Sequence, residues 1–481
     1  MNSSLRVPEC ARFLGVLFLF CVFTHLMVIA NPGFFSHDEW QKYDHVSTAG
    51  LGDFVARYGE FKAGPDFGYP VRPLGFIQQG FASIFMVDAP WISHFIEVMV
   101  HFANVMVFML LLGQMQVSRR TINIAALLFV ISPLSITSTG WSAASFDRIY
   151  PFFAMWAILF AWRIHQAPGA GGWVNYVGLL IAGLCASLSK ETAFMLPVLI
   201  AVGFLAMELH RTSLRDIFYS PRIYGVCLAI GLPFLMYLLV RLPALLVSFG
   251  GDIDSVYEPE STNIVQHLFF YWAYPFVNKA LEMSSMQYMS SLRISTGALI
   301  HLALLGLVAF HFGWKRAVAY VLLYFVFLVP VISITNNGAH YLYAATPVLS
   351  AALAGLLALS LRSGKRLLLA FMVLLVVFST VRFVQIQSSL YQQGLCQMRL
   401  IHSLEAQLPS VGGGEASSFP VLIDTSEASR GYVAVRTFLG RSYPGSPFGH
   451  VNFLWNASDF TEEMSAGLSL KMTSACYLKP N

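Results

Sequence analysis

An acidic pair, Asp38-Glu39, lies a few residues beyond the first long apolar run, in the aromatic stretch FFSHDEWQKYD (34–44). Carboxylates just outside a membrane span can act on a lipid-carried substrate. They can serve as a base that takes a proton from an acceptor hydroxyl, or as ligands of a divalent ion. A solvated pair in a loop is the alternative. We predict a catalytic role for Asp38 and Glu39, with Asp44 as a weaker candidate.

A second charged pair, Asp147-Arg148, follows the short turn GWSAASF and opens another apolar run. Asp147 is predicted to act with Asp38, as a second catalytic carboxylate or as a second ligand if a metal binds. Arg148 is predicted to bind phosphate through its guanidinium fork. Charges at the end of a span also serve as simple anchors, which is the alternative.

Other polar residues stand in turns on the same predicted side of the membrane. Lys190 precedes Glu191 between two short apolar runs, where its ammonium can meet a phosphate or form an ion pair within the turn. Arg72 lies between two prolines in YPVRPLG, and His340 and Tyr341 lie in NNGAHYLYAATP. We predict that Arg72, Lys190, His340 and Tyr341 contact the phosphate or head group of a donor.

The apolar run 91–113 carries a polar stripe, His94, Glu97, His101 and Asn104. On a helix these residues share one face, since successive residues are about 100° apart. Such a stripe must face the interior of a helix bundle. Metal or proton-relay chemistry is one interpretation, and hydrogen bonding between helices is the one we favour.

The composition is that of a polytopic membrane protein. Of 481 residues, 56% are hydrophobic and 11% are charged, against about 25% charged in a soluble protein. The net charge of +4 is small, and we expect no nucleic-acid partner. A span needs roughly 20 apolar residues, which predicts about eleven membrane helices. These are 13–30, 91–113, 121–138, 147–165, 174–189, 192–209, 223–247, 294–312, 317–334, 343–361 and 367–385.

Lys and Arg indicate the orientation, because they accumulate in cytoplasmic loops. With the N-terminus inside, every short inner loop is basic, as at Arg119-Arg120, Lys315-Arg316 and Lys365-Arg366. The short outer turns hold few basic residues. We predict a cytoplasmic N-terminus and a periplasmic or extracellular C-terminus, and the compact loops favour a bacterial inner membrane.

The predicted fold class is an all-α polytopic membrane protein with a small extracytoplasmic α/β domain. The transmembrane domain is 1–385, with large outer segments 31–90 and 248–293, and the C-terminal domain is 386–481. In the latter, FPVLIDTSEASRGYV has a strand–cap–helix pattern, and VNFLW indicates a second strand. Cys396 and Cys476 bracket this domain, where disulfides are allowed. A bond between them is predicted, with two free thiols as the alternative.

The chain contains no P-loop, no Gly-rich nucleotide fingerprint and no Cys/His zinc spacing. No cofactor is therefore indicated beyond the option of a divalent cation at Asp38 and Asp147. A donor made in the cytoplasm would have to arrive at the outer face already attached to a lipid.

The order of these motifs resembles the GT-C superfamily of membrane glycosyltransferases that use polyprenyl-phosphate sugars. The resemblance covers roughly 31–350 and is closest to the membrane part of the tetratricopeptide-containing transmembrane O-mannosyltransferases and their bacterial relatives. It rests on His37-Asp38-Glu39-Trp40, Arg72-Pro73-Leu74, Ser132-Pro133, Asp147, Ser189-Lys190-Glu191 with Leu196-Pro197, and Tyr341-Leu342-Tyr343. The chain departs from the family in having Ala339-His340 where Arg often precedes YLY, and in lacking the tetratricopeptide repeats.

The resemblance implies inverting transfer of a hexosyl or pentosyl group, with Asp38 as the base, Asp147 as the second outer acidic residue and Lys190 as the SKE lysine. We predict a polyprenyl-phosphate-linked donor and a cell-envelope glycan or glycolipid acceptor. A lipid-linked sugar flippase or transporter is one alternative, although transporters typically show repeated halves and no repeat is evident. A glycan polymerase or ligase is another, although 248–293 holds only two basic residues, Lys279 and Arg293.

Overall fold

The computed structural model describes most of the chain. The described residues are 7–34, 39, 42–43, 46, 50–56, 72–86, 88–166, 172–208, 220–248, 264–278, 284–332, 338–407, 419–425, 451–454 and 468–480. Asp38 and Asp44 lie outside these ranges, as does the stretch after the first strand of the tail, where a helix is predicted.

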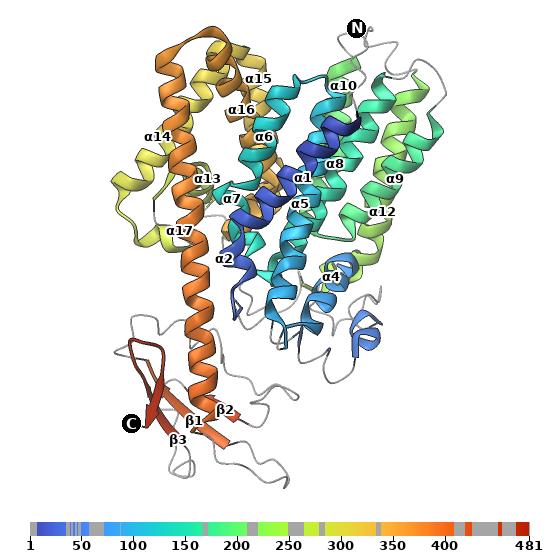
Figure 1. Cartoon of the computed structure of the whole chain (residues 1–481). Helices are drawn as coiled ribbons and strands as arrows, with labels where there is room; N and C mark the ends of the chain where they lie inside the picture. The colour runs from blue at the N-terminus through green and yellow to red at the C-terminus, as the bar shows by residue number, and fades with distance from the viewer. Residues whose placement is uncertain are drawn as a thin grey trace.

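The structure is a bundle of helices with a small sheet beyond one of its ends (Figure 1). The helices are α1 (Val7–Thr24), α2 (Leu26–Ile29), α4 (Pro73–Ile84), α5 (Pro90–Gln114), α6 (Arg119–Val130), α7 (Pro133–Thr139), α8 (Ser145–Gln166), α9 (Trp173–Ser187), α10 (Met195–Glu208), α12 (Pro221–Ser248), α13 (Ile264–Ala273), α14 (Ser291–Phe312), α15 (Trp314–Phe325), α16 (Thr346–Ser363) and α17 (Arg366–Glu405). Short 3₁₀ helices join them: η1 (Ser142–Ala144), η2 (Glu191–Phe194), η4 (Tyr274–Phe276), η5 (Ser284–Tyr288), η6 (Val326–Val331) and η7 (Ala339–Ala345).

The protein is an integral membrane protein. Among the described residues, six helices are long and apolar enough to cross a membrane, or seven if α6 and α7 form one bent span. Each of the eleven predicted spans overlaps at least one helix, while the count of eleven stays a prediction. Large apolar side chains such as Leu292, Phe310 and Leu367 are exposed, as expected of a surface that faces lipid rather than water.

The break between α6 and α7 has a local cause. Pro133 occupies the first turn of α7, and the side chain of Ser132 accepts a hydrogen bond from the Leu134 amide at 3.3 Å. Proline and a serine cap both favour the start of a new helix. The chain turns by 48° here, and α7 then leads directly into η1 and α8.

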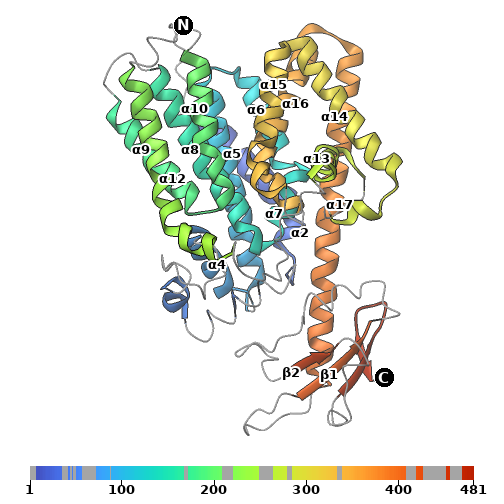
Figure 2. The same cartoon turned by 180° about the vertical axis from the view of Figure 1, so that it is seen from behind.

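Two large hydrophobic clusters of described residues form most of the interior of the bundle. The larger holds residues of α1, α5, α6 and α13 to α17, and the smaller holds residues of α8, α9, α10 and α12. Helix α8 joins them, because Leu159 belongs to the first and Tyr150 to the second. Figures 1 and 2 accordingly show α9 and α12 on the opposite side of the bundle from α14.

The bundle has two different ends. Helix α4 lies at the same end as the C-terminal sheet, and the α14–α15 and α16–α17 turns lie at the other (Figure 1). The basic pair Lys315-Arg316 opens α15, and Lys365-Arg366 opens α17. These charges therefore lie at the end away from α4.

Helix α17 runs along one side of the bundle and continues to the sheet as one helix of 40 residues (Figure 1). Position 385, the predicted end of the transmembrane domain, lies inside it. The four strands β1 (Phe419–Asp424), β2 (Val451–Leu454), β3 (Leu468–Met472) and β4 (Leu478–Pro480) have the order β2-β1-β3-β4. The strands predicted at PVLID and VNFLW are confirmed, and β1 pairs with β2 and β3 in parallel.

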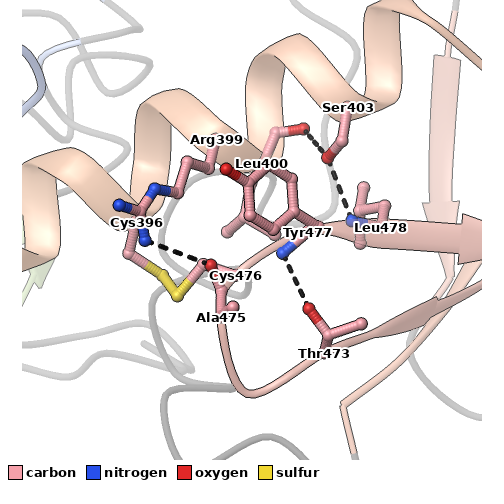
Figure 3. Close-up of a disulfide and its surroundings, with 9 residues drawn as sticks. All are labelled: Cys396, Arg399, Leu400, Ser403, Thr473, Ala475, Cys476, Tyr477 and Leu478. Carbon is pink, nitrogen blue, oxygen red and sulfur yellow. Dashed lines mark hydrogen bonds between the residues drawn. A yellow bond between two sulfur atoms is a disulfide. The ribbon is translucent and has the colours of Figure 1, made fainter.

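The predicted disulfide between Cys396 and Cys476 is confirmed (Figure 3). It ties α17 to the turn before β4, and the Leu478 amide donates to Ser403 Oγ at 3.0 Å beside it. The bond closes a loop with a sequence separation of 80 residues. Removal of a native disulfide typically costs about 2 to 5 kcal/mol, so this bond stabilises the attachment of the sheet to α17.

Candidate functional site

Four of the predicted site residues meet at the α4 end of the bundle. Asp147 lies in the first turn of α8, Lys190 in the turn between α9 and η2, and His340 and Tyr341 in η7. Lys190 forms an ion pair with Asp147, and Lys190 Nζ lies 4.3 Å from the centre of the Tyr341 ring. His340 Nε2 lies 3.9 Å from Asp147 Oδ2. We call Asp147, Lys190, His340 and Tyr341 the lysine cluster.

The lysine cluster is nearly enclosed. Asp147 is 2% and Lys190 4% exposed. Burial lowers the pKa of Lys190 from the ordinary 10.5 to about 8, although the neighbouring Asp147 carboxylate opposes that shift. Loss of solvent disfavours a charged ammonium. Lys190 is thus a cation whose charge depends on a nearby anion.

A second ion pair lies beside the cluster, nearer to the solvent. Arg72, the residue before α4, donates from Nε to Glu191 Oε2 at 2.8 Å, and these side chains are 23% and 22% exposed. The Arg72 guanidinium also lies 5.0 Å from the centre of the Phe146 ring. Because Glu191 directly follows Lys190, the two ion pairs are adjacent. The in-turn pairing of Lys190 with Glu191, considered from the sequence, is replaced by these two cross-element pairs.

Glu39 is brought to the same region. It is 3% exposed, and its Oε1 accepts from the Ala143 amide at 3.4 Å. The Ala143 carbonyl accepts from Gln79 Nε2 of α4 at 2.8 Å. Ala143 of η1 therefore bonds both Glu39 and Gln79 of α4, and it lies four residues before Asp147 in the sequence. Asp38, the preceding residue in the sequence, lies outside the described residues.

Arg148 lies elsewhere. It is fully buried and forms an ion pair with Glu97 of α5, also fully buried. Ser142 Oγ donates to Glu97 Oε1 at 2.5 Å, and Arg148 Nη1 donates to the Trp141 carbonyl at 3.3 Å. In this arrangement Arg148 joins α8 to α5 and η1 and presents no surface to a phosphate.

The polar stripe of α5 serves hydrogen bonding between elements. His94 Nε2 donates to the Gly33 carbonyl at 2.8 Å, and Asn104 Nδ2 donates to the Arg148 carbonyl at 3.0 Å. His101 Nδ1 bonds the Tyr343 hydroxyl at 2.7 Å. The structural interpretation of the stripe is therefore confirmed for these residues.

Two partners in the site were not foreseen. Trp141 packs edge-on against His340, with ring centres 4.8 Å apart. An ion pair of Glu191 within its own turn is the alternative considered from the sequence, whereas in the structure Glu191 pairs with Arg72. The only sequence signal for Trp141 is that it lies in the turn GWSAASF, whose last residue directly precedes Asp147.

In the part of the chain that the structure describes, no three His, Cys, Asp or Glu side chains gather as metal ligands. Asp147 is already matched by the Lys190 ammonium. The predicted cation ligands Asp38 and Asp147 thus stay a prediction.

The arrangement suits the binding of an anion at a membrane surface. Lys190 and Arg72 are neighbouring cations, and each forms an ion pair with a carboxylate. A phosphate that replaced the carboxylate at Lys190 would free Asp147 next to the bound group. A phosphate gains most from such cations in a site from which water is largely excluded.

No protein-family model matches the chain, and no curated protein matches it. Among solved structures, ArnT from Cupriavidus metallidurans in the apo state is similar over 98% of this chain and 94% of its own, with 12% identity and a TM-score of 0.49. The same protein bound to undecaprenyl phosphate gives 12% identity and a TM-score of 0.46, over 97% and 93% of the two chains.

The oligosaccharyltransferase AglB from Archaeoglobus fulgidus, in complex with an inhibitory peptide and a dolichol-phosphate, gives 14% identity and a TM-score of 0.47. That similarity covers 94% of this chain, which spans 65% of the length of the archaeal protein. All these TM-scores lie below 0.5, so the function must be argued from this chain's own residues.

Proposed function

We propose that this protein is a membrane glycosyltransferase. It would move a hexosyl or pentosyl group from a polyprenyl-phosphate donor to a cell-envelope glycan or glycolipid at the outer face of the membrane. The observation that carries the proposal is the pair of adjacent cations, Lys190 and Arg72, in a nearly enclosed site beside the acidic first outer loop. The motif resemblance to the GT-C superfamily supports the same chemistry.

The reaction needs a base and a stabilised leaving group. The acceptor oxygen would form a bond to the anomeric carbon while the bond from that carbon to the phosphate oxygen breaks, with inversion. The electron pair leaves with the lipid phosphate, where Lys190 and Arg72 would stabilise the negative charge. The acceptor proton would pass to the carboxylate of Asp38, with Glu39 beside it.

The distribution of charge supports the proposed orientation. The basic pairs Lys315-Arg316 and Lys365-Arg366 open helices at the end away from α4, and the lysine cluster lies at the α4 end. Basic residues favour the cytoplasmic side. We propose that the cluster and the sheet face the periplasm or the cell exterior.

Mass spectrometry of envelope glycans and lipid-linked sugars tests the proposal. Cells would carry the wild-type protein, Asp38→Asn or no protein. A matched control is Asp88→Asn, the same change at an exposed carboxylate of the same outer segment. In cells without the protein and in cells with Asp38→Asn, we expect one sugar decoration to disappear and its lipid-linked donor to accumulate. Cells with Asp88→Asn should resemble the wild type.

Two results would count against the proposal. Identical glycans with and without the protein would contradict transfer to an envelope glycan or glycolipid. A full level of decoration in Asp38→Asn would remove Asp38 as the base while leaving transfer itself in place.

A further inference from the structure

The segment Asn31–Phe34, which leads into the acidic first outer loop, is bound to the outer half of α17. Asn31 Nδ2 donates to the Leu390 carbonyl at 3.2 Å, and the Phe34 amide donates to Gln397 Oε1. Both Asn31 and Gln397 are buried. These contacts join residues more than 350 positions apart in the sequence.

The close approach depends on a glycine of α17. A Cβ atom at Gly394 would lie 1.7 Å from Asn31 Oδ1, far inside van der Waals contact, and one at Gly33 would lie 2.7 Å from the Gly394 carbonyl oxygen. Glycine destabilises the interior of a helix relative to alanine. At position 394 the small residue allows the segment to lie directly on the helix backbone.

The same segment is held from its other side by α5. His94 Nε2 donates to the Gly33 carbonyl at 2.8 Å, and the Phe34 ring stacks on His94 with centres 4.9 Å apart. Five residues after Phe34, Glu39 contacts the Ala143 amide. The chain is thus fixed at Phe34, four residues before Asp38, and again at Glu39.

We infer that Gly394 and Gln397 of α17 are positioning residues for the acidic pair Asp38-Glu39. This inference rests on the proposed function, because it assigns these residues a role in the same reaction. They touch neither donor nor acceptor; they act by fixing the start of the loop that carries the carboxylates. The disulfide at Cys396, one residue before Gln397, places the C-terminal sheet on the same turn of α17.

Kinetics of purified protein distinguish positioning from binding. Gly394→Ala would displace the segment and misplace the carboxylates, and a misplacement of about 1 Å can cost about 100-fold in rate. We expect kcat to fall about 10- to 100-fold. The donor KM should stay unchanged, because Lys190 and Arg72 belong to other elements. Gly306→Ala is the matched control, since Gly306 is also helical and has open space at its Cβ position.

The glutamine gives a second, independent pair of variants. Gln397→Met removes the acceptor of the Phe34 amide and should lower kcat, whereas Gln397→Glu keeps an acceptor oxygen and should restore it. Gln393→Met is the control, because Gln393 is also buried on α17 and bonds Ser389. Its kcat should match the wild type.

Hydrogen exchange at the Phe34 amide reports on the contact without any assay of transfer. We expect protection in the wild type and faster exchange in Gly394→Ala and Gln397→Met. Full kcat in Gly394→Ala, with Asp38→Asn inactive, would overturn the positioning role and leave the proposed function intact. A raised donor KM with unchanged kcat would also overturn it. Absence of transfer in the wild type, with the exchange pattern as expected, would overturn the proposed function while the anchoring stands.

Discussion

Asp147 and Arg148 are consecutive residues of α8, and they enter two ion pairs with different surroundings. Consecutive helix residues point about 100° apart, so Arg148 reaches Glu97 of α5 while Asp147 reaches Lys190 after α9. The Arg148–Glu97 pair is fully buried and is bonded to Ser142. The Asp147–Lys190 pair is close to His340 and to the partly exposed pair formed by Arg72 and Glu191.

The two ion pairs have similar charges but different surroundings. At Arg148 both Nη atoms have partners in Glu97, Ser138 and the Trp141 carbonyl, so that the pair holds several elements together. At Lys190 burial makes the charge costly, and we propose that an anion supplied from outside replaces its carboxylate partner. We therefore assign the Arg148–Glu97 pair to the fold and the Asp147–Lys190 pair to the site.

The largest effect is expected where the fold depends on the charge. Glu97→Leu would leave Arg148 buried without its carboxylate, which costs about 3 to 5 kcal/mol of stability. Unfolding in detergent measures the loss. The double variant Glu97→Leu with Arg148→Met should recover most of it, since an apolar pair replaces a buried ion pair at little cost. A single variant as stable as the wild type would refute the structural role.

The next effect is a pH dependence of the site. The pKa of Lys190 is lowered by burial to about 8, so the ligand-free protein loses the ammonium proton as the pH rises through that value. We expect kcat/KM for the donor to be level below about pH 7 and to fall about tenfold per pH unit above about pH 8. Lys190→Arg, which stays cationic, should move the fall to higher pH. A profile unchanged in Lys190→Arg would contradict the assignment.

The smallest effect is expected at the partly exposed pair. Arg72→Gln should change the free energy of unfolding by less than about 1 kcal/mol, because an ion pair that water still reaches contributes little. Its donor KM should rise all the same, because a phosphate contact is lost. The unfolding experiment and a donor titration on one preparation check both. A large loss of stability with an unchanged KM would place Arg72 with the structural pair.

The sequence predicts the apolar helices well, because length and hydropathy alone determine whether a segment can span a membrane. It also predicts the disulfide, since Cys396 and Cys476 are the two cysteines of the outer tail. The sequence does not predict the full length of α17, because the predicted span ends at 385 and the helix continues to Glu405. Beyond 385 the composition turns polar, yet buried residues continue at helical spacing, as at Leu390, Leu400 and Leu404.

The site is harder to predict. Asp147, Lys190 and His340 are each recognisable as candidates, but a sequence separation of 43 between Asp147 and Lys190 gives no indication of their contact. That contact depends on how α8, η2 and η7 pack. The buried ion pair of Arg148 is not predicted for the same reason, because its partner Glu97 belongs to another helix.

Binding of undecaprenyl phosphate to the purified protein tests the central claim most directly. The proteins to compare are the wild type, Lys190→Gln, and Lys315→Gln as a control that removes one lysine at the other end of the bundle. A charge-assisted phosphate contact contributes about 1.5 to 3 kcal/mol, or roughly 10- to 100-fold in Kd. We predict a loss of that size in Lys190→Gln and none in Lys315→Gln. Equal Kd values in the wild type and Lys190→Gln would contradict a phosphate site at Lys190.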